Sequence, residues 1–475
     1  MRVRLPLAIG AVLALTACGS SQQQAPSASA SRVGGNWTRF GYDAARSNSG
    51  PARTGIAAAR VGKLHRQQVR LPGTADSSPI YLRGVRVRGR AHNVFFVTTS
   101  YGITVAVDAR SGSILWRFKP RGYASWAGSD RITNSSPIAD PTRRYVYAEA
   151  PNGRVYKLTV ASGAVVWSLS ITKLPSREKL GTPLNFSRGL VIATTGGYIG
   201  DAPPYQGHVV TISRRGRIVH VWNSLCSDRH TLIAPSSCPQ SDSAIWARSG
   251  AVVVPGSGNL LVATGNARFD GRRYWGDSAL MLSANAARLL HNWTPRNQAQ
   301  LDGGDVDLGS TAPAILGASL AAQSGKDGII RLLRLPELGG TLGQTGGELE
   351  TVPAPGTSGV FSTMAVWRAG GTVRMFVGND SGVWGYVLSG GRLQVAWRRG
   401  EAGTSPVVAG GLLYVYDPNG GLNVFRPATG ALVARLPAGG GHWESPIVTD
   451  GRIALPEGSA NDETTTGVLD IWRVR

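Results

Sequence analysis

The stretch that decides the fold spans residues 105–116, VAVDARSGSILW. An alternating apolar run leads into the short turn ARSG (109–112), and a second run ends in Trp116. Alternation places Val105 and Val107 on one face of a strand, and Gly112 provides the conformational freedom that the turn needs. The pattern therefore predicts a β-hairpin in which a tryptophan follows the turn glycine at a fixed spacing.

The same hairpin recurs along the chain. Residues 155–167, VYKLTVASGAVVW, keep the spacing, and residues 422–436, LNVFRPATGALVARL, repeat it without the tryptophan. One hairpin repeated along a chain indicates a repeat architecture. A second mark, a small residue followed by proline and an apolar residue, precedes strand-like runs at residues 78–80, 136–138, 182–184, 312–314, 405–407 and 445–447.

Two further strand starts lack the proline, at residues 244–246 and 363–365, which gives eight starts in all. Pro406 and Pro446 lie 40 residues apart, a length that suits one four-stranded blade. Blades of this kind bury their faces by closing into a ring. We therefore predict an all-β fold, an eight-bladed β-propeller of four-stranded antiparallel blades. A β-sandwich array and a stacked solenoid are the alternatives.

The two ends of the repeat region predict how the ring closes. Residues 64–71, LHRQQVRL, have the pattern of an outer strand with no inner strands before it. Residues 467–474, GVLDIWRV, have the pattern of a third strand with no fourth strand after it. We expect the N-terminal strand to complete the last blade.

The N-terminus has the features of an export signal. Arg2 and Arg4 precede an apolar run, residues 5–15, that is too short to span a membrane as a mature helix. The following LTAC (15–18) resembles the bacterial lipobox, in which the cysteine is lipidated. We expect a signal peptide over residues 1–18 that ends at the lipidated Cys18, a flexible tether over 19–35 and the propeller over 36–475. The protein would then lie at the outer face of the cytoplasmic membrane or in the periplasm; an ordinary secretory signal is the alternative.

The formal net charge is +22, and arginine supplies nearly all of the basic residues. Such a charge favours acidic partners, which include anionic lipid, cell-wall polymers and nucleic acid. The basic residues are dispersed, no recognition helix is evident and the chain has an export signal, so we do not expect a nucleic-acid partner. We expect a monomer.

Two cysteines remain after Cys18. Cys226 and Cys238 lie close together in a loop-like stretch that contains Pro235. In an exported protein such a pair predicts a disulfide that ties the loop. A metal site is the alternative, because His230 lies between the two cysteines.

The AxDxxSGxxxW hairpin resembles the repeat of the pyrroloquinoline quinone (PQQ) propellers. That superfamily includes quinoprotein alcohol dehydrogenases and the non-enzymatic assembly lipoprotein of the outer-membrane BAM complex. The repeats cover most of residues 37–474, and WTRFGYDAAR (37–46) resembles the start of such enzymes. The repeat is specific for a fold and carries little information on function.

The middle of the chain carries a more specific resemblance. WAR (246–248), PGSGNL (255–260), TGN (264–266) and WGD (275–277) resemble one continuous quinoprotein segment. In that family a tryptophan stacks under the quinone ring and an asparagine binds the calcium ion that polarises the quinone. The resemblance implies these roles for Trp246 and Asn266. Core packing and a turn position are the respective alternatives.

Two later segments extend the resemblance. DGGDVD (302–307) lies where the family has an HDxWD-like stretch with the catalytic aspartate, although the histidine and tryptophan are missing here. The resemblance implies Asp307 or Asp305 as the base, because alcohol oxidation needs a carboxylate near the quinone carbonyl. GKDG (325–328) resembles a turn whose lysine contacts a quinone oxygen, which implies that role for Lys326. A solvated loop and an ordinary hairpin turn are the alternatives.

The sequence also departs from the quinoprotein pattern. The family's pocket contains a disulfide between adjacent cysteines, and this chain has no adjacent cysteines. The family's calcium-binding glutamate is expected near residues 195–208, where Asp201 is the only carboxylate. Because calcium prefers six to eight oxygen ligands, one carboxylate and one asparagine would make a poor site.

Three functions therefore compete. The first is an exported, membrane-anchored propeller lipoprotein that acts as a binding or scaffold protein for an envelope protein, a polymer or a small ligand. The second is a dehydrogenase of alcohols, sugars or aldehydes with PQQ and calcium; without a CxxCH motif it would need a separate electron acceptor. The third is a cell-wall or polysaccharide-binding protein, favoured by the charge and by aromatic residues expected to be exposed, Tyr123, Trp126 and Tyr274.

Overall fold

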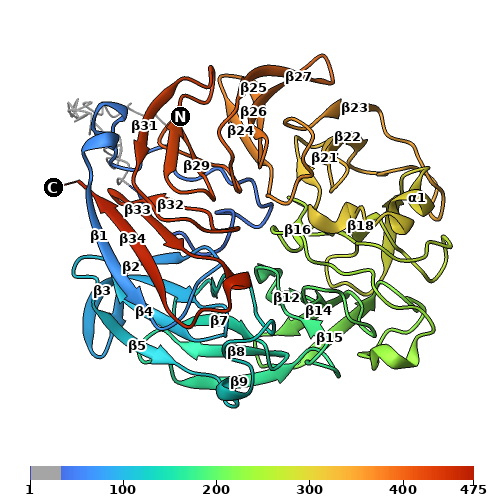
Figure 1. The fold of residues 1–475 in the computed structure, drawn as a ribbon, viewed down its shortest axis with the longest axis horizontal. Coiled ribbons are helices and arrows are strands. Elements are labelled where there is room, and N and C mark those ends of the chain that lie inside the picture. Colours follow the sequence, from blue (N-terminus) through green and yellow to red (C-terminus); the bar gives the residue numbers. More distant parts are fainter. Residues whose placement is uncertain (2–33, 475) are drawn as a thin grey trace. The chain divides into compact units, whose positions relative to one another are not determined.

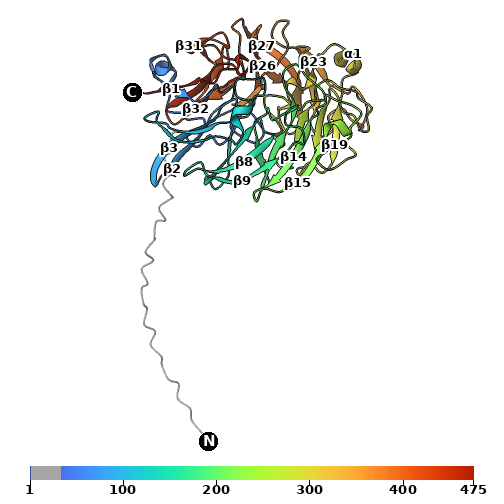
Figure 2. The same ribbon diagram turned by 60° about the horizontal axis from the view of Figure 1, so that its bottom comes forward.

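The computed structural model describes Met1 and residues 34–474, so the predicted signal peptide, the lipidation site at Cys18 and most of the predicted tether lie outside the described residues. Residues 33–475 form one compact unit. Within its described part, eight four-stranded antiparallel sheets are arranged as blades around a central axis (Figures 1 and 2). The predicted eight-bladed propeller is confirmed.

The first four blades follow one another along the chain. Blade one consists of β2 (Ile80–Val87), β3 (Arg90–Thr98), β4 (Thr104–Asp108) and β5 (Ile114–Phe118). Blade two consists of β6 (Ile138–Ala139), β7 (Tyr145–Ala150), β8 (Arg154–Thr159) and β9 (Val165–Ser170). Blade three consists of β11 (Asn185–Ser187), β12 (Leu190–Thr194), β14 (His208–Ser213) and β15 (Ile218–Asn223). Blade four consists of β16 (Val252–Val253), β17 (Leu260–Ala263), β18 (Ala279–Leu282) and β19 (Leu289–Trp293).

The remaining blades complete the ring. Blade five consists of β20 (Ala314–Ile315), β21 (Leu320–Gln323), β22 (Ile329–Arg334) and β23 (Glu350–Pro353). Blade six consists of β24 (Ala365–Ala369), β25 (Thr372–Asn379), β26 (Gly382–Ser389) and β27 (Arg392–Arg399). Blade seven consists of β28 (Val407–Ala409), β29 (Leu412–Tyr416), β30 (Leu422–Phe425) and β31 (Leu432–Leu436). Blade eight consists of β32 (Ile447–Thr449), β33 (Arg452–Glu457), β34 (Gly467–Arg473) and β1 (His65–Leu71).

Short elements lie in the connections between strands. A two-stranded sheet joins β10 (Glu178–Lys179) to β13 (Gly196–Gly197). The helical elements are α1 (Gln298–Gly303) and the 3₁₀ turns η1 (Ala58–Lys63), η2 (Tyr123–Ser125), η3 (Pro235–Ser237), η4 (Leu308–Ser310) and η5 (Ala460–Asp462). No helix in the described part of the chain has the length and apolar character needed to cross a membrane.

The ring closes as the sequence predicts. β1 pairs antiparallel with β34 over its full length, from His65 opposite Arg473 to Leu71 opposite Gly467. The strand order of blade eight is β32, β33, β34 and then β1, so the N-terminal strand forms the outer edge of the last blade. This exchange joins the two ends of the chain in one sheet and lets the first and last blades pack without a seam.

The repeated hairpin owes its residue pattern to contacts within the turn and between blades. In blade one, the Asp108 carboxylate accepts hydrogen bonds from the backbone N–H groups of Arg110 and Ser111, at 3.0 and 2.7 Å. Gly112 has a φ of 75°, in the left-handed region that glycine adopts without strain. The aspartate and the glycine of the motif are therefore turn residues.

The tryptophan of the motif packs on the next blade. Trp116 donates its indole N–H to the Val160 carbonyl of blade two at 2.9 Å, and a Cβ on Gly163 would lie 2.6 Å from the indole ring. Each such contact needs a glycine opposite the ring, because any side chain there would occupy the same space. The same arrangement joins Trp167 to Gly216 and Trp397 to Gly430. The repeat is thus a device for stacking neighbouring blades.

One predicted strand start is wrong. The innermost strand of blade four begins at Val252, whereas the sequence pattern placed its start at residues 244–246. Those residues belong to a loop ahead of the strand, where the Ile245 N–H donates to the Thr195 carbonyl at 3.0 Å. The apolar residues there lie at the axis of the ring and do not form a strand of the blade. The other seven starts are confirmed.

The chain ahead of β1 runs along the innermost strands of several blades. Trp37 exchanges backbone hydrogen bonds with Tyr81 of blade one, and the Ala44 carbonyl accepts from Val253 of blade four at 2.9 Å. The Arg46 guanidinium is buried and donates to backbone carbonyls of Phe40, Pro183 and Leu184. This segment therefore ties the blades together at the axis.

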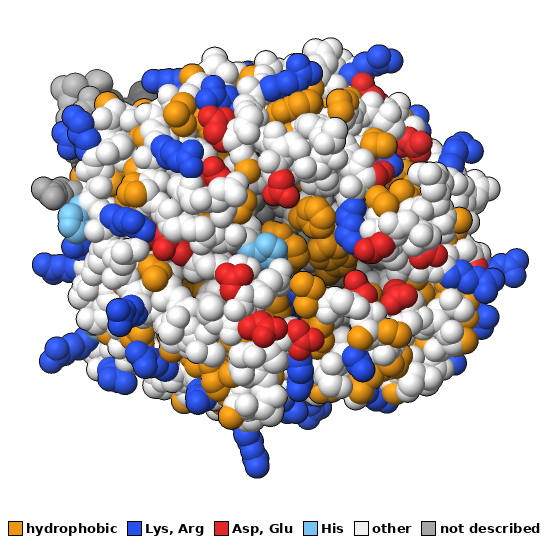
Figure 3. Space-filling view, in the orientation of Figure 1, with side chains coloured by type: hydrophobic (Ala, Val, Ile, Leu, Met, Phe, Trp, Pro, Cys, Tyr) orange, Lys and Arg blue, Asp and Glu red, His pale blue; other side chains and the backbone are white. Residues whose placement is uncertain are grey.

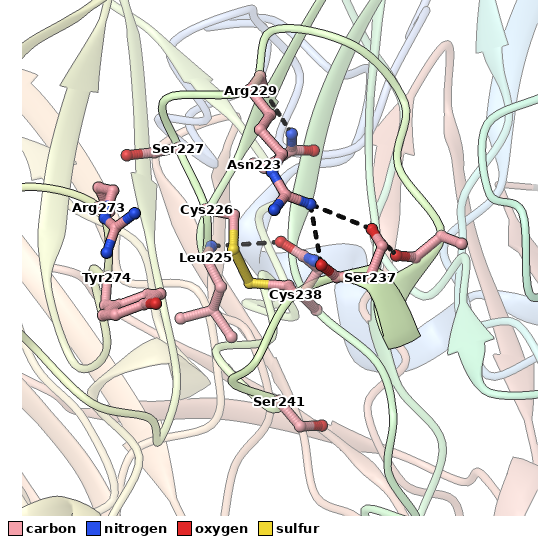
Figure 4. The surroundings of a disulfide bond; sticks show 12 residues. Asn223, Leu225, Cys226, Ser227, Arg229, Ser237, Cys238, Ser241, Arg273 and Tyr274 are labelled. Atoms are coloured by element: carbon pink, nitrogen blue, oxygen red, sulfur yellow. Dashed lines mark hydrogen bonds between the residues drawn. A yellow bond between two sulfur atoms is a disulfide. The ribbon is translucent and has the colours of Figure 1, made fainter.

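The predicted disulfide is confirmed. Cys226 and Cys238 are bonded within the long loop between β15 and β16 (Figure 4). Beside the bond, the Arg229 guanidinium donates to the Ser237 carbonyl at 2.9 Å, which ties the same loop a second time. The metal-pair alternative for the two cysteines is thereby excluded.

Candidate functional site

A cavity of about 240 Å³ lies where the blades meet. Its walls are loops that precede innermost strands and loops that connect second and third strands. Figure 3 shows a hollow near the centre of this face, with hydrophobic side chains inside it and acidic side chains around it. The side chains that the argument below uses are Asn134, Lys179, Trp246, Asp307, Lys326, Phe361 and Trp443.

Three aromatic rings form one wall of the pocket. The Trp246 ring lies 5.9 Å from Trp443 and 6.0 Å from Phe361, measured between centroids. Phe361 and Trp443 are stacked with an interplanar angle of 16°. Aromatic faces of this kind attract planar or cationic groups. Phe361 and Trp443 belong to no motif that sequence reasoning recognised, because their loops do not repeat.

The carboxylate and lysine residues that the resemblance singled out meet beside Trp246. The Lys326 ammonium lies 2.5 Å from Asp307 Oδ2 and 3.1 Å from Asp305 Oδ1. Asp307 is buried, whereas the Asp305 side chain is 74% exposed at the rim. Burial alone would lower the pKa of Lys326, but the ion pairs with Asp307 and Asp305 raise it above its ordinary value. Lys326 is therefore a fixed cation.

Asn266 joins the same group of residues. Its backbone N–H donates to Asp307 Oδ1 at 2.9 Å, and its side-chain amide donates to Asp305 Oδ1 at 2.7 Å. The Lys326 ammonium lies 5.8 Å from the Trp246 ring centroid. The structure thus brings together all five residues that the resemblance named, Trp246, Asn266, Asp305, Asp307 and Lys326, although it assigns none of them a role in catalysis.

The oxygen atoms at this place do not suit a calcium ion. Both Asp305 and Asp307 already hold the Lys326 ammonium and an Asn266 N–H. Asn266 Oδ1 is buried without a hydrogen-bond partner. The oxygens left free by these contacts are far fewer than the six to eight that calcium needs. Across residues 34–474, no three His, Cys, Asp or Glu side chains gather as a metal site would require.

Lys179 gives the pocket a second cation of a different kind. It lies on the short strand β10 and lines the cavity, and its ammonium forms no hydrogen bond or ion pair with the described residues. Burial lowers its pKa to about 8. Asp201, the nearby carboxylate of the third blade, is engaged by the Tyr205 hydroxyl at 2.9 Å. Lys179 is consequently a cation without a fixed counter-ion.

A buried polar network supports the aromatic wall from behind. Asp76 accepts from the Asn134 amide at 2.7 Å and from the Trp443 N–H at 2.9 Å, and it shares a 2.7 Å hydrogen bond with His442. Burial alone would raise the pKa of Asp76, but His442 and Arg248 hold it below its ordinary value. The His442 ring stacks on Trp443 with 4.1 Å between centroids. The network therefore fixes the position of Trp443 in the pocket.

The aromatic residues expected at the surface are mostly buried. Trp126 is 3% exposed and donates its indole N–H to the Tyr101 carbonyl, and Tyr274 is 6% exposed against the disulfide loop. Tyr123 is half-buried beside Lys119. The prediction of an exposed aromatic surface is wrong for Trp126 and Tyr274, because long loops fold over them. The polysaccharide-binding hypothesis loses its aromatic support.

Comparisons with known proteins agree on the fold. The family model described as "Outer membrane protein assembly factor BamB" matches residues 62–235. Quinohemoprotein alcohol dehydrogenase from Comamonas testosteroni has a TM-score of 0.68 at 14% identity, over 93% of this chain and 81% of that chain. A europium-containing methanol dehydrogenase has a TM-score of 0.67 at 12% identity, over 93% and 98% of the two chains.

A further structural match is BamB from Moraxella catarrhalis, with a TM-score of 0.52 at 13% identity, over 86% of this chain and 98% of that chain. A comparison with curated proteins found no match. At such low identities the structural matches establish a shared fold and no shared activity. Together with the repeat and the family match over residues 62–235, they show that this chain has the fold of the PQQ-like β-propellers.

Proposed function

We propose that this protein is an exported lipoprotein, anchored through Cys18, whose propeller acts as a binding or scaffold protein in the cell envelope. Its ligand site is the axial pocket. The pocket offers an aromatic wall of Trp246, Phe361 and Trp443 and the unpaired ammonium of Lys179. Such a site suits a small ligand or a partner side chain that combines a planar apolar part with an anionic group.

One observation carries the preference for binding over catalysis. The Lys326 ammonium holds Asp307 at 2.5 Å and Asp305 at 3.1 Å, which engages both carboxylates that the resemblance implied as the catalytic base. A carboxylate acts as a general base only when it can reach and accept the substrate proton. Asp307 is instead a buried partner of a fixed lysine.

A PQQ-dependent dehydrogenase of alcohols, sugars or aldehydes is the second candidate. The observation in its favour is that Trp246, Asp307 and Lys326 line one pocket and that Asn266 donates to Asp307 beside it. Chance alone seldom brings four such residues from separate loops together. This arrangement is also what a binding protein would retain from a catalytic ancestor.

Calorimetric titration of PQQ into the propeller, with and without calcium, separates the two candidates. We expect no calcium-dependent binding. Tight binding that requires calcium and is lost in both Trp246→Ala and Asn266→Ala would overturn the proposal and establish the dehydrogenase. Trp367→Ala is the matched control, because Trp367 is a half-buried tryptophan of blade six outside the pocket.

The lipid anchor has its own test. In a host that processes bacterial lipoproteins, the full-length chain is expected to partition into the detergent phase, and Cys18→Ser is expected to abolish this partition. Mass spectrometry of the N-terminal peptide then reports the added acyl chains directly. A Cys18→Ser chain that still partitions into detergent would contradict the anchor.

A further inference from the structure

The two faces of the ring are built from different connections. Consecutive strands of a blade are antiparallel, so the turns between first and second strands lie at one end of the ring together with the turns between third and fourth strands. The other connections, which include most of the pocket loops, lie at the opposite end. Charge on the first set of turns is therefore charge on the face away from the pocket.

The turns of blades one to three on that face carry exposed arginines. They lie between β2 and β3, between β4 and β5, between β6 and β7 and between β14 and β15. We call the surface that they form the arginine face, and it is defined by Arg88, Arg110, Arg144, Arg214, Arg215 and Arg217. All six side chains are exposed.

Nothing on the arginine face neutralises this charge. The carboxylates in or beside these turns, Asp108 and Asp140, are 9% and 2% exposed and serve as turn residues. No described residue forms an ion pair with any of the six arginines. The pocket face differs, since its loops carry exposed carboxylates among their basic residues, at Asp130, Asp228, Asp305, Asp462 and Glu463 (Figure 3).

The chain enters the propeller at blade eight, at the same end of the ring as the arginine face. The Gly35 N–H donates to Thr449 Oγ1 at 3.0 Å, and a Cβ on Gly34 would lie 2.3 Å from the Asp450 nitrogen. Thr449 and Asp450 begin the turn between β32 and β33, the first and second strands of blade eight. The residues between Cys18 and Gly34 reach at most about 56 Å when fully extended. A lipid on Cys18 would hold this face near the bilayer.

We propose that the arginine face lies against an anionic phospholipid surface, with the axial pocket turned away from the membrane. The proposal rests on the lipid anchor of the proposed function. Arginines near an anionic bilayer are attracted to its negative surface potential, and a basic patch adds to the hold of an acyl chain. The orientation leaves the pocket free to meet a ligand or partner in the aqueous compartment.

Vesicle sedimentation of the unanchored propeller, residues 33–475, tests the face alone. This part forms one compact unit with its own hydrophobic cores, so it can be studied without the N-terminal segment. We expect it to bind vesicles that contain phosphatidylglycerol and not vesicles of phosphatidylcholine, and to be released by salt. The triple variant Arg214→Gln, Arg215→Gln, Arg217→Gln is expected to weaken partition about 100-fold, because each arginine contributes roughly fivefold.

The matched control removes the same charge from the pocket face. Arg121→Gln, Arg177→Gln and Arg272→Gln change three exposed arginines there, and we expect partition to fall less than threefold. Equal losses in the two triple variants would overturn the proposal, since net charge alone would then explain binding. Binding to a soluble anionic polymer such as heparin, with none to vesicles, would also overturn it and assign the face to a polymer.

The full-length chain tests the orientation. Single cysteines at Ser162, in the turn between β8 and β9, and at Ser125, on the pocket face, are treated with a membrane-impermeant maleimide on phosphatidylglycerol vesicles. We expect Ser162→Cys to be protected and Ser125→Cys to react freely. Equal reactivity on a vesicle-bound chain would overturn the orientation, whereas failure of the chain to bind phosphatidylcholine vesicles would count against the lipid anchor instead.

Discussion

The outer hairpins and the axial loops differ in whether their sequences repeat and in how fully their polar and charged groups are paired. In the hairpins, Trp116, Trp167 and Trp397 each pack on a glycine of the next blade and donate to a backbone carbonyl there. At the axis, the pocket loops differ from one another, and Lys179 forms no hydrogen bond or ion pair with the described residues. The repeated hairpins hold neighbouring blades together through packing and hydrogen bonds. The axial loops do not repeat, and an unpaired charged side chain in them is a group with which a ligand would pair.

Replacing a tryptophan that packs on the next blade tests how much stability the hairpins contribute. Trp116→Ala removes a buried indole from between blades one and two, and we expect a loss of about 3–5 kcal/mol in the free energy of unfolding. Trp443→Ala, in the half-buried aromatic wall of the pocket, should cost less than half as much. Urea unfolding followed by circular dichroism measures both. Equal losses would show that the axis contributes as much stability as the hairpins do.

The same contrast explains what the sequence could predict. Periodic alternation, a repeated turn and two nearby cysteines are local or repeated signals that a sequence shows directly. They allowed prediction of the strands, the closure by residues 64–71 and the disulfide. Trp246, Asn266 and Lys326 could be placed in one site only through a family resemblance. Phe361 and Trp443 could not be found at all, because a pocket residue in a loop that occurs once leaves no periodic signal.

The predicted start of blade four shows that an apolar pattern can also predict a strand where none forms. Ala244, Ile245 and Trp246 have the pattern of a strand start, yet they line the pocket. Apolar residues bury themselves equally well in a strand or against the axis, so the pattern alone does not separate the two. The error fell where the chain departs from its repeat, which is where function concentrates in folds of this type.

A buried carboxylate on blade two gives a smaller effect with a pH signature. Both oxygens of Glu149 are buried, and burial raises its pKa to about 8. The folded state therefore holds a proton that the unfolded chain releases above about pH 4.5, so this residue makes stability fall as the pH rises from 4.5 to 8. Glu149→Gln should stabilise the protein by roughly 4 kcal/mol at pH 8 and by almost nothing at pH 4.5.

Thermal unfolding at the two pH values checks this effect. Glu337→Gln is the matched control, because Glu337 is an exposed turn residue. A stabilisation by Glu149→Gln that is the same at pH 4.5 and pH 8 would show that better packing, rather than the proton, is responsible.

The smallest perturbation compares two lysines of the same pocket. Burial lowers the pKa of Lys179 to about 8, whereas ion pairs raise the pKa of Lys326. Only an uncharged amine attacks an acylating reagent, so at pH 8 about half of Lys179 is reactive and, at an ordinary lysine pKa, less than about 1% would be. We expect brief acetic anhydride treatment at pH 8, followed by peptide mass spectrometry, to modify Lys179 first and Lys326 last. Since the chain has six lysines, each can be followed separately. If Lys326 reacts as fast as Lys179, the ion pairs with Asp305 and Asp307 do not hold in solution, and the argument against a catalytic carboxylate fails with them.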